Sequence, residues 1–296
     1  MLLWLNRFPL FLAVLVTWIC GAAATEQPHP VETIALHNVF QLADGIYSGN
    51  SPDSEAAFRE LQKLGVKTII SVDGAKPNVA LARKFGMRYV HLPIGYGGVP
   101  RARAVELAKA AQTADGPLYV HCHHGKHRGP AAAAAVCRAT QSWSAEKADG
   151  FLKQAGTSLD YAGLYRDVRF SRPPSAEELA RVPREFPEAA KTPDIVNVMV
   201  EIDEHFAALK TAQKAGWREV PVPQATLLWE LVREHARDPQ TARQGDDYTA
   251  KLGDCERAAD ALRHLLRDPG VTSAARDAAL LSTGQTCGVC HKAHRN

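Results

Sequence analysis

In the first half of the chain, short apolar runs alternate with amphipathic stretches. Runs rich in β-branched and aromatic residues predict strands at 67–73, 87–94 and 117–122. Between them, segments with helical periodicity predict helices at 77–86 and 101–114. Strands that alternate with helices in this way indicate a mainly parallel sheet flanked by helices, in a three-layer α/β domain.

Two further elements precede these strands. The segment "NVFQLADGIYSGNSP" (38–52) is typical of a hairpin or an edge strand, and "SEAAFRELQKLG" (54–65) predicts a helix that ends at Gly65. Both belong to the same predicted α/β domain.

The second half of the chain has a different pattern. Residues 171–193 contain five prolines among charged residues, which is the composition of a linker with room for one short helix. Beyond it the β-branched runs disappear, and four helical segments joined by short connections suggest an antiparallel four-helix bundle. These helices are expected at 193–216, 223–238, 246–268 and 272–295.

The N-terminus resembles a secretory signal peptide. One positive charge lies before residue 8, an apolar run spans 8–20, and Gly21 to Ala24 supply small residues for cleavage. The run is short for a membrane span of about 20 residues, although a retained anchor is the alternative. We therefore expect an exported, periplasmic protein with no stable membrane span after cleavage. The expected division is 1–24 signal peptide, 25–172 α/β domain, 173–193 Pro-rich linker and 194–296 helical domain.

Composition limits the classes of partner. The formal net charge of the 296-residue chain is +3, and no long Lys/Arg block occurs, so general binding to nucleic acid or anionic membranes is not suggested. Of six cysteines, Cys20 falls in the signal peptide, and five remain. An odd number in an exported protein argues against a complete disulfide framework.

The segment "YVHCHHGKHRGP" (119–130) carries candidate chemistry. Cys122 ends a predicted strand and Pro130 starts a predicted helix, with Gly125 able to take a backbone angle that other residues resist. Such a strand-to-helix loop directs its N–H groups inward and forms an anion cradle that also stabilises a thiolate. Arg128, six residues after Cys122, can grip an oxyanion with two hydrogen bonds.

These residues resemble the signature loop of the cysteine-based protein tyrosine and dual-specificity phosphatases: His-Cys, five residues including a glycine, then Arg. The resemblance covers about residues 35–170, and "GIYSGNSP" and "RYVHLPIGYGG" are similar to small bacterial members. It implies that Cys122 attacks phosphorus and that Arg128 and the loop amides hold the phosphate oxygens. The phosphate-binding residues so implied are His123, His124, Gly125, Lys126, His127 and Arg128.

The sequence departs from this family at two places. The family usually takes its general acid from an aspartate in a loop corresponding to 91–100, which here contains no Asp or Glu. Asp73 follows another parallel strand and should lie at the same sheet edge as Cys122, so it is the candidate acid; a turn residue is the alternative. Gly129 stands where the family usually has Ser or Thr. Oxyanion binding without turnover is therefore a second hypothesis.

The histidines around Cys122 allow another interpretation, a metal site. In this family His121 usually points away from the loop and supports it. His123, His124 and His127 lie in a loop whose amides face an anion, without helical or hairpin ligand spacing. The phosphatase interpretation is favoured over the metal site.

A second motif, "CGVCHKAHR" (287–295), lies in the last predicted helix. The spacing of Cys287 and Cys290 suits addition to both vinyl groups of haem, and His291 can then be the proximal iron ligand. A redox cysteine pair or half of a zinc site are the alternatives. A second cysteine pair and a βαβ context are both missing, and export fits haem c attachment.

Four helices with this motif in the last one resemble the class II c-type cytochromes, the cytochrome c-prime group, over about residues 194–296. Arg295 follows the motif as that group expects, but His294 replaces the usual aromatic residue. In low-spin relatives a methionine of the first helix is the sixth iron ligand, which implies Met199; an ordinary core methionine is the alternative. Without Met199 a five-coordinate iron could bind a small gas.

The leading hypothesis is an exported phosphatase that hydrolyses phosphate monoesters through Cys122 and carries covalent haem c. Its haem domain would transfer electrons to a redox partner protein or sense redox state or gas. The alternative is a catalytically weak or inactive oxyanion-binding or redox-sensing module coupled to an electron-transfer cytochrome.

Overall fold

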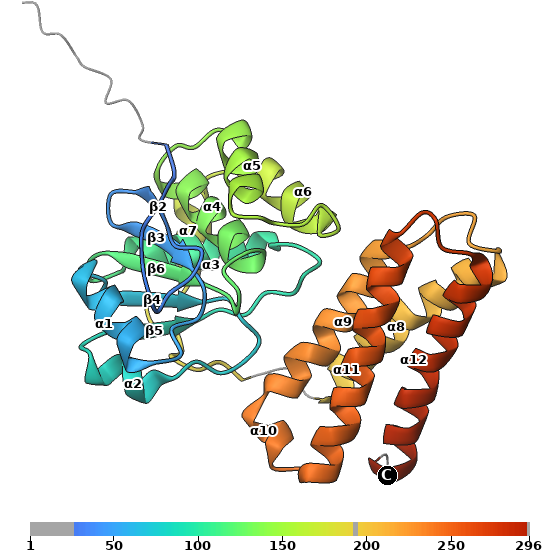
Figure 1. Ribbon diagram of the computed structural model, residues 1–296. Coiled ribbons are helices and arrows are strands. Elements are labelled where there is room, and N and C mark those ends of the chain that lie inside the picture. The colour runs from blue at the N-terminus through green and yellow to red at the C-terminus, as the bar shows by residue number, and fades with distance from the viewer. Residues whose placement is uncertain (1–26, 192–194, 295–296) are drawn as a thin grey trace, which may run out of the picture.

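The computed structural model describes residues 27–191 and 195–294 (Figure 1). The predicted signal peptide (1–24) and Arg295 lie outside the described residues. Among the helices that the structure describes, none combines the length and the apolar character needed to cross a bilayer.

A six-stranded sheet forms the centre of the first half, in the order β1-β2-β3-β6-β4-β5. The pairs β3–β6, β6–β4 and β4–β5 are parallel, whereas β1, β2 and β3 are joined antiparallel. The predicted hairpin and the three predicted strands are confirmed, and the two-residue β1 was not foreseen. The strands are β1 (His29–Pro30), β2 (Phe40–Ala43), β3 (Ile46–Gly49), β4 (Thr68–Ser71), β5 (Arg88–His91) and β6 (Leu118–His121).

Helices cover both faces of the sheet, as the predicted three-layer α/β architecture requires. Successive strand residues point to opposite faces, so Ile70 and Val120 enter one core while Ile69 and Tyr119 enter another. The second core is closed by α1 (Glu55–Lys63) and α2 (Val79–Lys84). The first is closed by α3 (Arg101–Gln112), α4 (Arg128–Thr140), α5 (Ala145–Gln154) and α6 (Ala162–Phe170). Helices α5 and α6 had not been predicted individually.

The proline-rich segment after α6 packs against the sheet. It contains one short helix, α7 (Ala176–Arg181), which begins with a capping box between Ser175 and Glu178. Beyond α7, the carbonyl of Pro187 accepts a hydrogen bond from the His91 amide at 2.8 Å. This segment, expected to be a linker, therefore also covers the edge of the sheet at β5.

The C-terminal region is helical. Four long helices share one hydrophobic core, with α9 packed on α8 and α11, and α12 packed on α11 and α8 (Figure 1). Their bounds agree closely with the predicted segments, and a short α10 was not foreseen. The helices are α8 (Ile195–Lys214), α9 (Val222–Arg237), α10 (Pro239–Ala242), α11 (Asp246–Arg267) and α12 (Ser273–His294).

Candidate functional site

Cys122 lies immediately after β6, at the carboxyl end of a central strand. Its neighbours β3 and β4 end in register with it, since Gly49 and Ser71 both pair with His121. The side chain of Cys122 is only 3% exposed. Loops that leave neighbouring parallel strands at their carboxyl ends meet at one edge, which is the usual position of a ligand site in such sheets.

The loop after Cys122 is held from outside through its carbonyl groups. The carbonyl of His123 accepts from the Ser51 amide at 3.0 Å, that of Gly125 from the Asn38 side chain at 2.8 Å, and that of Lys126 from the Thr157 hydroxyl at 2.6 Å. In a trans peptide the N–H points opposite to the C=O, and none of the peptide bonds described is cis. The N–H groups that follow these carbonyls therefore face the inside of the loop, as an anion cradle requires.

Gly125 is required by the path of this loop. Its φ of +65° is in the left-handed region, and a Cβ there would lie 2.3 Å from the backbone carbon of Gly49. The loop therefore passes directly against the end of β3. At its far end α4 begins at Arg128, and its N-cap residue His127 makes no side-chain cap hydrogen bond. The positive end of a 13-residue helix thus adjoins Cys122.

Arg128 is buried, with 1% of its surface exposed, and has several partners. Its Nη2 donates to Asp73 Oδ1 at 3.0 Å, and its Nη1 lies 2.6 Å from Glu234 Oε2 and donates to the Ile94 carbonyl at 3.2 Å. Its guanidinium carbon lies 4.1 Å from the centre of the Tyr96 ring. This guanidinium is fixed in position by ion pairs at both of its terminal nitrogens.

Asp73 lies at the sheet edge where it was expected, two residues beyond the end of β4. It contacts Arg128, and its Oδ2 also accepts from Arg237 Nη1 at 3.1 Å. Burial alone would raise the pKa of Asp73, but the two guanidinium groups outweigh it and lower the pKa below its usual range. In this arrangement Asp73 is an ionised counter-ion to Arg128. A general acid must hold a proton, so the arrangement favours a positioning role over the predicted acid role.

Helix α9 supplies three charged side chains to the site from more than 100 residues away, and no sequence motif predicted them. Glu234 contacts Arg128, Arg237 contacts Asp73, and Glu230 accepts hydrogen bonds from the hydroxyls of Tyr96 and Tyr161, each at 2.8 Å. The only local signal was an acidic pair, Glu230 and Glu234, four residues apart on an amphipathic helix.

The histidines of the loop are neutral at neutral pH. Burial lowers the pKa of His123 and of His124 to about 4, and that of His127 to about 3. His121 lies behind the loop between Tyr89 and Tyr119, where its Nδ1 is 3.2 Å from the Cys122 carbonyl. Nowhere in residues 27–191 and 195–294 do three or more His, Cys, Asp or Glu side chains form a group that could hold a metal ion.

Gly129 packs against the cysteine. A Cβ at this position would lie 2.9 Å from the Cys122 nitrogen and 3.3 Å from its Sγ. A serine or threonine there would need the backbone of the loop to shift. Gly129 has no side-chain hydroxyl, and its small size allows α4 to pack closely on Cys122.

The cysteines of the C-terminal region lie together. Cys287 and Cys290 lie on the core-facing side of α12, and Cys255 lies on α11. A hydrogen bond between Cys255 and Cys287 raises the pKa of Cys255 and lowers that of Cys287. The two residues proposed as iron ligands are placed differently. Met199 of α8 packs against the same core, whereas His291 is exposed at the next position after Cys290.

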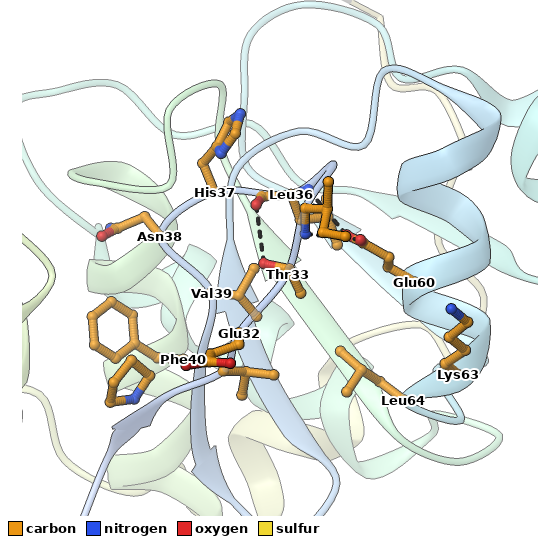
Figure 2. A pocket seen from close by; sticks show the side chains of 13 residues that line it. Glu32, Thr33, Leu36, His37, Asn38, Val39, Phe40, Glu60, Lys63 and Leu64 are labelled. Atoms are coloured by element: carbon orange, nitrogen blue, oxygen red, sulfur yellow. Dashed lines mark hydrogen bonds between the residues drawn. The ribbon is translucent and has the colours of Figure 1, made fainter.

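A hollow lies away from this site, between the chain before β2 and helix α1 (Figure 2). Its volume is about 770 Å³, and residues 30–40 and 60–64 contribute most of its lining. None of the predicted site residues lines it. One lining residue, Asn38, is connected to the loop through its hydrogen bond to the Gly125 carbonyl.

About half of the chain is similar to known proteins. Over 168 residues the chain is 26% identical to the dual specificity protein phosphatase TpbA of Pseudomonas aeruginosa. The match covers 51% of this chain and 76% of TpbA. The crystal structure of P. aeruginosa TpbA matches 50% of this chain and 91% of its own, with 23% identity and a TM-score of 0.44. The catalytic domain of the Saccharomyces cerevisiae PP-IP phosphatase Siw14 matches 51% and 93%, with 16% identity and a TM-score of 0.43.

No protein-family model matches the chain. The matched relative is a phosphatase. In this chain Cys122 and Arg128 lie at the two ends of a loop whose N–H groups face inward. About half of this chain is therefore similar in sequence to a dual specificity protein phosphatase.

Proposed function

We propose that this protein hydrolyses phosphate monoesters through the Cys122 thiolate. The sulfur attacks phosphorus, an S–P bond forms, and the bond to the leaving oxygen breaks as that oxygen takes a proton from water. Water then breaks the S–P bond, which releases inorganic phosphate and restores the thiolate. The single observation that carries this proposal is the loop between Cys122 and Arg128, whose carbonyls are turned outward so that N–H groups face the anion.

Two observations support the substrate class: the positively charged groups around the Cys122 loop, and the similarity to a known phosphatase. Inward N–H groups, the N-terminus of α4 and the Arg128 guanidinium all favour a phosphate-bearing anion. The related protein is a dual specificity protein phosphatase, which makes phosphotyrosine and phosphoserine peptides suitable substrates to assay.

The test is phosphate release from p-nitrophenyl phosphate and from a phosphotyrosine peptide by the full chain. Cys122→Ser should abolish release and still bind the oxyanion vanadate, whereas Cys137→Ser should retain activity. Cys137 is the matched control because it is a buried cysteine in the body of α4, outside the loop. An inactive wild type, or a Cys122→Ser variant with unchanged activity, contradicts the proposal.

A second candidate function is oxyanion binding without turnover. It is favoured by the state of Asp73, which is held ionised by two guanidinium groups and so lacks the proton that the leaving oxygen needs. Vanadate binding by a wild-type protein that releases no phosphate would support this function over hydrolysis.

We also propose that the C-terminal helices form a four-helix domain that binds haem c covalently. Cys287 and Cys290 are free thiols on the core-facing side of α12, His291 follows them directly, and Met199 packs against the same core. Cys287 and Cys290 would hold haem through two thioether bonds, and His291, alone or with Met199, would bind its iron. Haem bound there would supply an iron that exchanges electrons with a redox partner protein or binds a small gas.

Expression of the full-length chain with haem-maturation machinery tests this second proposal. The wild type should carry haem that survives denaturation, and a Cys287→Ala/Cys290→Ala variant should not. Cys255→Ala is the control, since Cys255 is adjacent but outside the motif. Covalent attachment of haem outside the cytoplasm would also agree with the export proposed for residues 1–24, which fractionation of expressing cells can test.

A further inference from the structure

Helix α9 covers the loop that is proposed to bind phosphate. Glu234 projects from its C-terminal half and places Oε2 2.6 Å from Nη1 of Arg128. The other oxygen of this carboxylate lies against Gly74, where a Cβ would be only 1.4 Å from Oε1. A glycine directly after Asp73 therefore leaves the space that the Glu234 carboxylate fills.

The Glu234 carboxylate engages a guanidinium nitrogen that a bound phosphate could use. An arginine can hold a phosphate through two parallel N–H···O bonds, either from both terminal nitrogens or from Nε and one terminal nitrogen. Here Nη2 of Arg128 donates to Asp73 and Nη1 pairs with Glu234, while the Arg128 side chain is 1% exposed. Two carboxylates thus use both terminal nitrogens of the only arginine in the loop.

The contact between Glu234 and Arg128 is fixed by neighbouring interactions of α9 and α11. One turn earlier on α9, the buried Glu230 accepts from the hydroxyls of Tyr96 and Tyr161. Near the end of α9, Arg237 pairs with Asp73. Arg267 at the end of α11 adds an ion pair with Asp160. These contacts hold α9 over the loop along about two turns of helix.

We propose that Glu234 is an internal competitor of the substrate phosphate for Arg128, so that the helical region restrains the site. The proposal rests on the proposed phosphate-binding function of the loop. Substrate binding then requires the Glu234 side chain to leave Arg128, by rotation or by movement of α9. Like-charge repulsion between a phosphate and the Glu234 carboxylate opposes binding for as long as the carboxylate stays in place.

The other role open to Glu234 is that of the general acid missing from residues 91–100. Burial raises the pKa of Glu234, although the adjacent Arg128 guanidinium opposes this. The two roles predict opposite results when the carboxylate is removed. Loss of a competitor increases phosphate affinity and kcat/KM, whereas loss of an acid decreases kcat and leaves phosphate affinity unchanged.

The experiment compares the full-length wild type with Glu234→Gln and with Glu219→Gln. Glutamine keeps the shape of the side chain without its charge, and Glu219 is an exposed glutamate in the turn before α9. The measurements are inhibition by inorganic phosphate, kcat/KM for p-nitrophenyl phosphate and the rate at which iodoacetamide alkylates Cys122. For Glu234→Gln we expect about tenfold tighter phosphate binding, which corresponds to about 1.4 kcal/mol. We also expect a higher kcat/KM and faster alkylation, with Glu219→Gln unchanged.

Unchanged phosphate affinity in Glu234→Gln overturns the proposal, and a fall in kcat with unchanged affinity assigns Glu234 as the acid instead. If no variant hydrolyses the ester, phosphate affinity measured by calorimetry decides. Tighter binding by Glu234→Gln then supports the competitor while the hydrolytic function fails, and equal affinity contradicts the competitor.

Discussion

Asp73 Oδ1 lies 3.0 Å from Nη2 of Arg128, and both side chains are buried, with 4% and 1% of their surfaces exposed. The two residues are 55 positions apart: Asp73 follows β4, and Arg128 is the first residue of α4, which follows the neighbouring parallel strand β6. The carboxylate fixes the plane of the guanidinium at the mouth of the Cys122 loop. A carboxylate that holds a guanidinium in this way is ionised, whereas a proton donor must be protonated.

Asp73→Asn is therefore expected to lower kcat/KM by a similar factor at every pH between about pH 5 and 8. The pKa of Asp73 lies below its usual range because Arg128 and Arg237 outweigh the effect of burial, so the wild-type side chain is ionised throughout that interval. The measurement is the pH dependence of p-nitrophenyl phosphate hydrolysis. A loss that is large at low pH and fades as the pH rises would instead identify Asp73 as a proton donor.

Arg128→Lys should reduce kcat/KM by about 100-fold or more, because lysine cannot provide two parallel hydrogen bonds to phosphate. It should also destabilise the fold by about 3 kcal/mol, since Asp73 and Glu234 lose their shared buried partner. Urea unfolding and vanadate affinity check both effects. Arg59→Lys is the control, as Arg59 is an exposed arginine of α1. Equal vanadate affinity in Arg128→Lys and wild type would contradict this role.

Gly125→Ala is expected to lower both stability and phosphate binding. The φ of +65° costs an alanine about 1 kcal/mol. In addition, the new Cβ would lie within 2.5 Å of the Asn50 nitrogen, which forces the loop away from β3. Thermal unfolding with and without phosphate measures both effects. Gly156→Ala is the matched control, since Gly156 also has a positive φ, +81°, and a Cβ there meets nothing within 4 Å. A Gly125→Ala variant as stable as Gly156→Ala would contradict the close approach of the loop to β3.

His121 should make the protein less stable as the pH falls from about 6.5 to 4. Burial lowers the pKa of folded His121 to about 4, whereas the unfolded side chain titrates near 6.5. Below about 6.5 the unfolded chain takes up a proton that the folded chain refuses, so unfolding becomes more favourable. Between pH 7 and 5 the wild type should lose about 2 kcal/mol more unfolding free energy than His121→Asn. Equal losses by urea titration would show that His121 does not contribute.

Met199→Leu should change the visible spectrum of the haem-loaded protein if Met199 is an axial ligand. Leucine keeps the packing of α8 on the shared core but cannot bind iron. The spectrum should change from the low-spin to the high-spin type, and affinity for carbon monoxide should rise. Met87→Leu is the control, because Met87 packs in the core between the sheet and α1. An unchanged spectrum would assign Met199 to packing alone.

The sequence alone determined the local elements and the Cys122 loop. Period-two and period-3.6 patterns located the central strands and the long helices within a few residues, because each element buries one regular face. Cys122, Gly125 and Arg128 were recognisable since the turn from strand to helix fixes their spacing within eight residues. Parallel strands also placed Asp73 at the edge of the sheet that holds Cys122.

Only the tertiary structure decided what surrounds Arg128. Glu234 and Arg237 lie more than 100 residues away along the chain, and neither belongs to a motif. Their position depends on how α9 packs across the sheet edge, which no local pattern records. The protonation state of Asp73 could not be predicted from the sequence for the same reason. Its pKa results from competition between burial and two guanidinium groups, and all three are set by long-range packing.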